Sequence, residues 1–133
     1  MSALGALADY VAPDEAGAAA FLDDPRNRLL IAQVEGRAVG ALIAHLLPRA
    51  DGDTMLLIYD LGVEERYRRR GIARALVGEA EAIAREAAAS KMWVVTGRTN
   101  EAAMALYTSL GGVAEADDDV VFGWRFAPPR SER

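Results

Sequence analysis

The chain has 133 residues, of which 52% are apolar, with no cysteine and a formal net charge of −5. We expect a single domain over residues 1–133, with residues 1–13 and 128–133 poorly ordered, because this length supports one hydrophobic core. The absence of cysteine excludes disulfides, thiolate metal sites and a cysteine nucleophile, and it fits a cytoplasmic location. No apolar run reaches bilayer-spanning length, and no secretory signal opens the chain. The acidic net charge argues against nucleic-acid binding and favours a cationic partner.

The first part of the chain predicts a helix and a hairpin. The helix begins at Pro13, has acidic residues in its first turn, and ends after Leu22 at an Asp-Asp-Pro sequence. Residues 29–34 and 38–47 have the composition of strands, and Glu35-Gly36-Arg37 is the turn between them.

The middle of the chain predicts a strand, a helix and a second strand. After a loop, residues 54–63 form a strand, and a helix follows over residues 71–89, with Glu81 and Arg85 as a favourable ion pair on its surface. Residues 92–96 form a compact buried strand, and the helix between the two strands demands that they run parallel. The apolar stripe of the helix consists of Ile72, Leu76, Ala80, Ile83 and Ala87.

The last part predicts a helix and a closing hairpin. Asn100 is a favourable N-cap for a helix over residues 101–110, and Gly111 ends it. Residues 113–116 and 120–126 then form a hairpin around the acidic turn 117–119. Aromatic residues at strand spacing are expected in the core: Trp93, Phe122 and Trp124.

The most informative stretch joins the strand 54–63 to the helix that begins at Gly71. Its charged turn ends in Arg68-Arg69-Arg70, in an otherwise acidic chain. The N-terminus of a helix presents N–H groups without intrahelical partners together with partial positive charge, and glycine allows close approach. The stretch therefore predicts an anion site suited to a phosphate or pyrophosphate.

Two motifs carry a family resemblance. Arg68-Arg69-Arg70-Gly71-Ile72-Ala73 fits the pattern Q/R-x-x-G-x-G/A between a strand and a helix. Asn100 and, further on, Leu106-Tyr107-Thr108-Ser109-Leu110-Gly111 fit a second pattern, an Asn followed by a helix that ends in Leu-Tyr-x-x-Leu-Gly. Over roughly residues 28–126 the chain resembles the GNAT superfamily of N-acetyltransferases.

The resemblance implies an α+β fold, with a mostly antiparallel sheet, one parallel strand–helix–strand unit and flanking helices. The family's first strand is missing or degenerate here, and the unpaired edge favours a homodimer. A second departure is Gly112, which stands where the family often has an aromatic residue. Ile58-Tyr59-Asp60-Leu61, together with both motifs, is most similar to the type I aminoglycoside 3-N-acetyltransferases, which are antibiotic-resistance enzymes.

The resemblance also implies binding residues for acetyl-CoA. The pyrophosphate binds the N–H groups of Arg69, Arg70, Gly71, Ile72 and Ala73, with charge-assisted contacts from Arg68 and Arg69. The pantetheine arm lies like an added strand beside Leu61, Gly62 and Val63, and Gly62 marks a β-bulge that frees an N–H for the thioester oxygen. Asn100 contacts the coenzyme arm as well as capping its helix.

Two residues are expected to act in the chemistry. Tyr107 is the acid for the leaving thiolate, although a tyrosine on a helix can equally be a core residue. Asp60 orients or deprotonates the incoming ammonium, because a carboxylate in an apolar strand needs a partner; the alternative is an Asp that bonds loop backbone or only binds the cation.

Other polar residues are secondary candidates. Glu64 and Asp118 are expected to help bind the cationic substrate, although both also suit solvated turns. His45 has no ligand partners at metal spacing, so we expect no metal and interpret it as structural or at most as lining the acceptor cleft.

The expected activity is direct acetyl transfer from acetyl-CoA to a small cationic amine, with no nucleic acid and no membrane as partner. One alternative keeps the donor and takes a protein N-terminus, a lysine or a polyamine as acceptor. Another is a non-catalytic acyl-CoA-binding module, against which Tyr107 and Asp60 argue.

Overall fold

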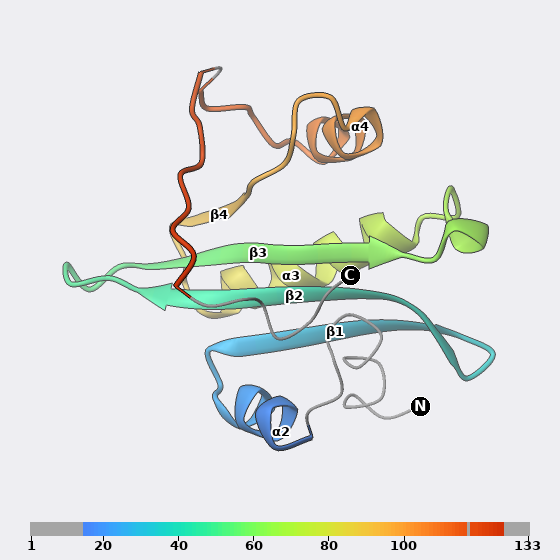
Figure 1. Cartoon of the computed structure of the whole chain (residues 1–133), viewed down its shortest axis with the longest axis horizontal. Helices are drawn as coiled ribbons and strands as arrows, with labels where there is room; N and C mark the ends of the chain where they lie inside the picture. The colour runs from blue at the N-terminus through green and yellow to red at the C-terminus, as the bar shows by residue number, and fades with distance from the viewer. Residues whose placement is uncertain (1–14, 117, 127–133) are drawn as a thin grey trace. The chain divides into compact units, whose positions relative to one another are not determined.

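The structure is a computed structural model that describes residues 15–116 and 118–126 (Figure 1). These residues belong to two compact units, the first ending at Val95 and the second beginning at Thr96. The predicted helix start at Pro13, the turn residue Asp117 and the tail 128–133 lie outside the described residues. Within the described ranges, no helix is long and apolar enough to cross a bilayer.

The first unit contains a four-stranded sheet in the order β1-β2-β3-β4. Strands β1 and β2 are antiparallel, as are β2 and β3, whereas β3 and β4 are parallel, which confirms the predicted mixture. The hairpin turn has positive φ at Glu35 and Gly36, 51° and 80°, as a type I′ turn requires. The strands are β1 (Asn27–Val34), β2 (Arg37–Pro48), β3 (Thr54–Val63) and β4 (Lys91–Val94).

Helix α3 (Ile72–Glu86) covers one face of this sheet and lies behind β2 and β3 in Figure 1. A Cβ added to Gly40 would lie 3.4 Å from the Ile72 side chain, so the even-numbered residues of β2 from Gly40 onward face α3. The buried face of the helix is slightly rotated from the predicted apolar stripe, because it includes Val77 and Ala84. The helix also ends earlier than predicted, at Glu86. The core between helix and sheet includes Leu42, Ala44, Leu56, Ile58, Leu76 and Ala80.

Helix α2 (Glu15–Asp23) packs near β1 and on the opposite face of β2. The ring of Phe21 meets the ring of His45 edge-on, with centroids 5.9 Å apart. His45 is odd-numbered on β2, so its side chain points away from α3. The sheet therefore has a helix on each face, as the family resemblance implies.

Strand β3 contains a bulge at Tyr59. Ala44 of β2 pairs with Ile58 and Ile43 pairs with Asp60, which leaves Tyr59 as the extra residue. The predicted bulge at Gly62 is wrong, because Gly62 pairs with Ala41 in regular register. A bulge whose extra residue keeps negative φ does not need glycine, and Tyr59 is not among the positive-φ residues.

The second unit consists of α4 (Glu101–Ser109) and an irregular segment after it. The predicted N-cap is confirmed, since Asn100 Oδ1 accepts from the Ala103 N–H at 3.1 Å. At the other end, Gly111 has φ 92°, its N–H donates to Thr108 O at 3.1 Å, and the Gly112 N–H donates to Tyr107 O at 2.9 Å. This is a Schellman motif. A Cβ on Gly112 would lie 3.0 Å from Tyr107 O, which accounts for glycine where the family often has an aromatic residue.

The predicted closing hairpin is wrong for the described residues, since neither 113–116 nor 118–126 contains a strand. Phe122 and Trp124 are 76% and 75% exposed, so the expectation that they are core residues is also wrong. A two-stranded hairpin is marginal without a third strand or a helix to pack on, and local pattern cannot supply that partner. The β4 prediction was partly wrong as well: the strand ends at Val94, is half-buried at most, and is followed by Val95 at 63% exposure.

Candidate functional site

The connection from β3 to α3 is anchored to the sheet. The Glu64 N–H donates to Val39 O at 2.8 Å, and a short 3-10 helix, η1 (Glu65–Tyr67), follows. Arg68 Nε–H donates to Val63 O at 3.1 Å, which ties the basic turn back to the last residue of β3. The position of the helix start is therefore defined by two strands.

The backbone of this connection has the form of an anion site. Arg69 and Gly71 both have positive φ, 65° and 80°, and Gly71 is the N-cap of α3. No side chain caps the helix, and its first turn contains no acidic residue. The first helical bond runs from Ala75 N to Gly71 O, so the Ile72 and Ala73 N–H groups have no intrahelical acceptor. A left-handed non-glycine residue is unfavourable by roughly 1–2 kcal/mol, so the surroundings must hold Arg69 in this conformation.

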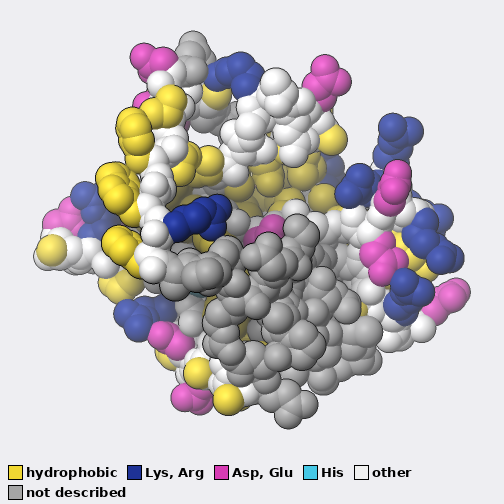
Figure 2. All heavy atoms as spheres, in the orientation of Figure 1, with side chains coloured by type: hydrophobic (Ala, Val, Ile, Leu, Met, Phe, Trp, Pro, Cys, Tyr) yellow, Lys and Arg dark blue, Asp and Glu magenta, His cyan; other side chains and the backbone are white. Residues whose placement is uncertain are grey.

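The charge around the helix start is positive. Arg68, Arg69 and Arg70 are exposed, and no ion pair within residues 15–116 and 118–126 engages any of them. The guanidinium carbons of Arg66 and Arg70 lie 5.3 and 5.1 Å from the centre of the Tyr67 ring, which orders both side chains. Figure 2 shows basic side chains gathered where β3 meets α3, with acidic ones among them.

Glu64 has a structural partner. Both of its carboxylate oxygens accept from Arg37 Nη2, at 2.9 and 3.1 Å. This ion pair joins the start of β2 to the residue after β3. The arrangement favours a structural role for Glu64 over the predicted contact with substrate.

Strand β3 extends beyond its parallel neighbour. Its pairing with β4 ends at Ile58 and Val94, whereas its pairing with β2 continues to Val63 and Gly40. The segment from the bulge to Val63, which contains the predicted residues Leu61 and Gly62, thus has a strand on one side only within the first unit. An extended ligand can add to such an edge by main-chain hydrogen bonds.

Asp60 lies on the face of the sheet that α3 does not cover. It pairs with Ile43, which shares a face with His45, and paired residues present their side chains to the same face. Asp60 is exposed, so the expectation that it is buried and therefore needs a partner is wrong. Tyr59, at the bulge, is 70% exposed, and its ring centroid lies 5.5 Å from that of His45.

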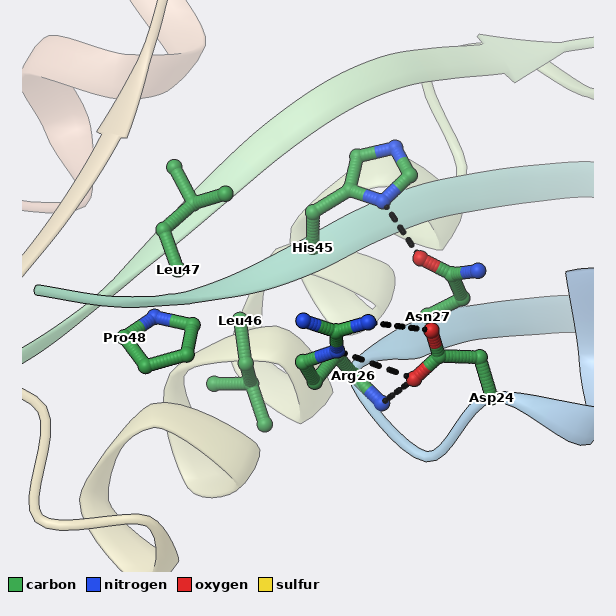
Figure 3. Close-up of a pocket in the computed structure, with 7 residues that line it drawn as sticks. All are labelled: Asp24, Arg26, Asn27, His45, Leu46, Leu47 and Pro48. Carbon is green, nitrogen blue, oxygen red and sulfur yellow. Dashed lines mark hydrogen bonds and ion pairs between the residues drawn. The ribbon is translucent and has the colours of Figure 1, made fainter.

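Next to this face is an open pocket of about 330 Å³, lined by the α2–β1 connection and the end of β2 (Figure 3). Within it, Asn27 Oδ1 lies 2.9 Å from His45 Nδ1. Hydrogen bonds from the Arg26 side chain and then its backbone N–H lower the pKa of the Asp24 carboxyl to about 2. Asp24 is therefore already engaged by Arg26.

The sequence did not identify Asn27 or Tyr59 as candidate site residues. Asn27 precedes the expected strand by two residues and fits no motif. Tyr59 has the composition of an ordinary residue in an apolar strand, and only the strand pairing shows that it is the bulge residue. Both are recognised only through the register of the sheet.

The second unit contains Asn100, Tyr107 and Asp118. The Asn100 side chain caps α4, Tyr107 is half-buried on that helix, and Asp118 is exposed. The structure thus places Asn100 and Tyr107 at the two ends of one helix.

No group of three or more His, Cys, Asp or Glu side chains among the described residues is arranged to hold a metal ion. Among the described residues, the basic helix start is a ligand site of a different kind. It suits a phosphate-bearing ligand and not a cation.

Comparisons with known proteins identify relatives. The sequence pattern of the acetyltransferase (GNAT) family matches residues 5–112. N-acetyltransferase 8 from Rattus norvegicus is 33% identical over 94 residues, which are 68% of this chain and 41% of that protein. The chain thus spans about two fifths of the length of this curated relative.

Two solved structures are similar in fold. An aminoglycoside acetyltransferase from an uncultured soil metagenomic sample is 25% identical, with a TM-score of 0.79 over 93% of this chain and 88% of that one. The ribosomal-protein-alanine N-acetyltransferase of Brucella melitensis biovar Abortus 2308 is 28% identical, with a TM-score of 0.66 over 84% and 82% of the two chains. The mixed sheet and its helices are those of the GNAT fold.

Proposed function

Because the chain belongs to the acetyltransferase (GNAT) family, we propose that it transfers an acetyl group from acetyl-CoA to a primary amine of a small cationic acceptor, by direct attack within a ternary complex. The observation that carries this proposal is the helix start at Gly71. It combines uncapped N–H groups, left-handed backbone at Arg69 and Gly71, and three exposed arginines.

In the proposed complex the pyrophosphate of acetyl-CoA accepts from the N–H groups of residues 69–73. Backbone N–H groups and the helix dipole favour this anion, and charge-assisted contacts from Arg68 and Arg69 strengthen the binding. Arg70 stacks on Tyr67 and contributes mainly through its charge. The pantetheine arm then lies along Leu61, Gly62 and Val63, where β4 no longer pairs with β3.

This placement directs the thioester toward the bulge at Tyr59. There, an N–H of the β3 segment can donate to the carbonyl oxygen as negative charge develops on it. Asp60, exposed beside the bulge, attracts and orients the acceptor ammonium. Tyr107 is proposed as the acid that protonates the leaving thiolate, and Asn100 as a contact to the coenzyme arm; the support for both is the family motif.

The proposed acceptor is an aminoglycoside, acetylated at its 3-N position, which would confer antibiotic resistance. Support comes from the motif resemblance and from the similarity to the soil aminoglycoside acetyltransferase. Asp60 and the net charge of −5 suit a polycation. Asp118 is proposed as an additional attraction for it.

The N-terminus of a protein is a second candidate acceptor. The Brucella ribosomal-protein-alanine enzyme is 28% identical to this chain, against 25% for the aminoglycoside enzyme, although its TM-score is lower, 0.66 against 0.79. A peptide N-terminus and an aminoglycoside amine share the ammonium chemistry that Asp60 would recognise, so the acceptor must be identified by assay.

The test measures thiol release from acetyl-CoA with aminoglycosides, alanine-terminal peptides and polyamines as acceptors. We expect release with one acceptor class, and the Michaelis constant for acetyl-CoA to rise in Arg69→Gln. Arg49→Gln is the matched control, because Arg49 forms a surface ion pair with Asp51 in the loop before β3. Coenzyme binding without release for any amine would indicate a non-catalytic acyl-CoA-binding module instead.

A further inference from the structure

His45 is held in one orientation by three different elements of the first unit. Its ring lies between the edges of Phe21 on α2 and Tyr59 on β3, with interplanar angles of 83° and 72°. Its Nδ1 lies 2.9 Å from the side-chain oxygen of Asn27 on β1. These three contacts, which we call the clamp on His45, fix the orientation of the ring.

The hydrogen bonds around Asn27 assign the tautomer of this ring. Asn27 Nδ2 donates to Phe21 O at 3.1 Å, which orients the amide so that its oxygen faces His45. An amide oxygen only accepts, so Nδ1 of His45 must carry the proton. In the neutral ring the lone pair is then on Nε2, which Figure 3 shows directed away from Asn27.

His45 also shares a face with the groups proposed to receive the acceptor. Tyr59, whose ring it contacts, is the bulge residue where β3 extends past β4, and Asp60 follows it on the same face. Among the described residues, β3 presents Tyr59, whose ring contacts that of His45, and Asp60 on this face, and the pocket beside the ring contains Asp24 and Arg26 before β1. Asp24 and Arg26 form an ion pair at 2.8 Å, which leaves Asp60 to attract a cation.

We propose that Nε2 of His45 accepts the proton of the acceptor ammonium, and that Asn27 is a positioning residue that fixes the Nδ1–H tautomer of the neutral ring, so that the lone pair is on Nε2. The inference rests on the proposed acetyltransferase function and assigns the general base to His45, with Asp60 as the attracting carboxylate. One proton passes from the ammonium to Nε2, and the freed amine forms a C–N bond with the acetyl carbon. The C–S bond breaks, the sulfur takes its electron pair, and the proton lost by the new amide nitrogen ends on the sulfur.

The first test is kinetic. In His45→Gln we expect kcat to fall by about 100-fold, the lower end of the effect of losing a general base, with the Michaelis constant for acetyl-CoA unchanged within about twofold. In Asn27→Ala we expect a smaller fall in kcat, and in Asn27→Asp recovery, because a carboxylate also accepts from Nδ1–H. Arg49→Gln is the control, since it removes a surface charge outside the pocket without removing a hydrogen bond to the ring, and we expect wild-type kcat.

The second test observes the ring itself. His45 is the only histidine, so ¹⁵N NMR of the imidazole reports one residue. We expect the Nδ1–H tautomer in the wild type, in Arg49→Gln and in Asn27→Asp, and a mixture in Asn27→Ala. A structural role alone would not couple the tautomer to kcat across this series.

The outcomes separate the two proposals. Wild-type turnover with an unchanged kcat in His45→Gln overturns the inference and leaves the proposed function standing. No turnover by the wild type with any amine overturns the proposed function and, with it, the proton transfer to His45. An Nε2–H ring in the wild type overturns the inference whatever the kinetics show.

Discussion

Gly71 and Gly78 belong to the same helical segment but have opposite backbone requirements. Gly71 is the left-handed N-cap of α3, with φ 80°, whereas Gly78 is an exposed residue in the helix interior. A Cβ would meet no atom within 4 Å at either position, so sterics with neighbours cannot distinguish them. The difference lies entirely in the backbone conformation.

Gly71→Ala should therefore lower the free energy of unfolding by about 1 kcal/mol, because alanine is unfavourable in the left-handed region. Gly78→Ala should raise it by about 0.5–1 kcal/mol, because alanine loses less backbone entropy in a helix. Urea denaturation of the two variants measures both changes. Effects of the same sign would show that the helix does not begin at Gly71 as described.

Tyr107 lies on α4, whose end is closed by the Schellman motif at Gly111 and Gly112. Tyr107→Phe removes only the hydroxyl, so we expect kcat to fall by about 100-fold while acetyl-CoA binding changes less than about twofold. Stopped-flow turnover and calorimetric titration measure the two quantities. Equal losses in both would show that Tyr107 contributes binding instead of acid catalysis.

At the scale of elements, local patterns predicted every α-helix and strand that the structure describes in the first unit, although α3 and β4 end earlier than expected. Strand-like composition and the turn residues between the strands predicted the β1–β2 hairpin. The observed bounds of β3 agree with the predicted strand, residues 54–63. The misplaced bulge and the missing hairpin have one cause, since each depends on a partner distant in sequence. The bulge at Tyr59 is set by the pairing of β3 with β2, and the expected hairpin after α4 lacks a neighbour to pack on.

The same distinction, between features set by neighbours in sequence and features set by distant residues, applies to the candidate site. The basic helix start could be predicted, because strand, turn and helix signals are contiguous in sequence. The clamp on His45 could not, because it combines residues from α2, β1 and β3. The Arg37 partner of Glu64 was missed for the same reason.

The start of the parallel β3–β4 pair carries a charge-dependent link between two segments. The Ser90 hydroxyl donates to Asp53 Oδ2, and the Ser90 N–H donates to Thr54 O at 3.0 Å. The bond from Ser90, followed by that from the Thr54 N–H, lowers the pKa of the Asp53 carboxyl below its ordinary value of 3.8. A lowered pKa stabilises the folded state above the ordinary value, and this stabilisation is lost as the pH falls through the folded pKa.

Ser90→Ala should thus destabilise the protein most near neutral pH, and the difference from the wild type should shrink as the pH falls below about 4. Thermal unfolding between pH 7 and pH 2.5 measures the difference. Ser109→Ala is the control, because the Ser109 hydroxyl donates to a backbone carbonyl, Leu106 O. A Ser90→Ala effect that is constant with pH would contradict the role of Asp53.

At the scale of the whole molecule, the proposed function requires an acidic protein to bind an anionic coenzyme. With a net charge of −5, the long-range field opposes acetyl-CoA, so attraction depends on the local arginines and the helix start. Local attraction between exposed charges is screened at about 8–10 Å at physiological salt. Affinity for acetyl-CoA should therefore decrease with added salt, and should do so less steeply in Arg69→Gln.

The coenzyme also tests whether the two units unfold together, as the expected single domain requires. At about one hundred times its dissociation constant, acetyl-CoA should add roughly 2.7 kcal/mol to the free energy of unfolding, because it binds the folded state only. Differential scanning calorimetry should then show one transition that moves upward by several degrees, with a smaller shift in Arg69→Gln and a wild-type shift in Arg49→Gln. Two transitions, of which acetyl-CoA moves only one, would instead mean that the segments before and after Val95 fold independently and that the coenzyme is bound by one of them alone.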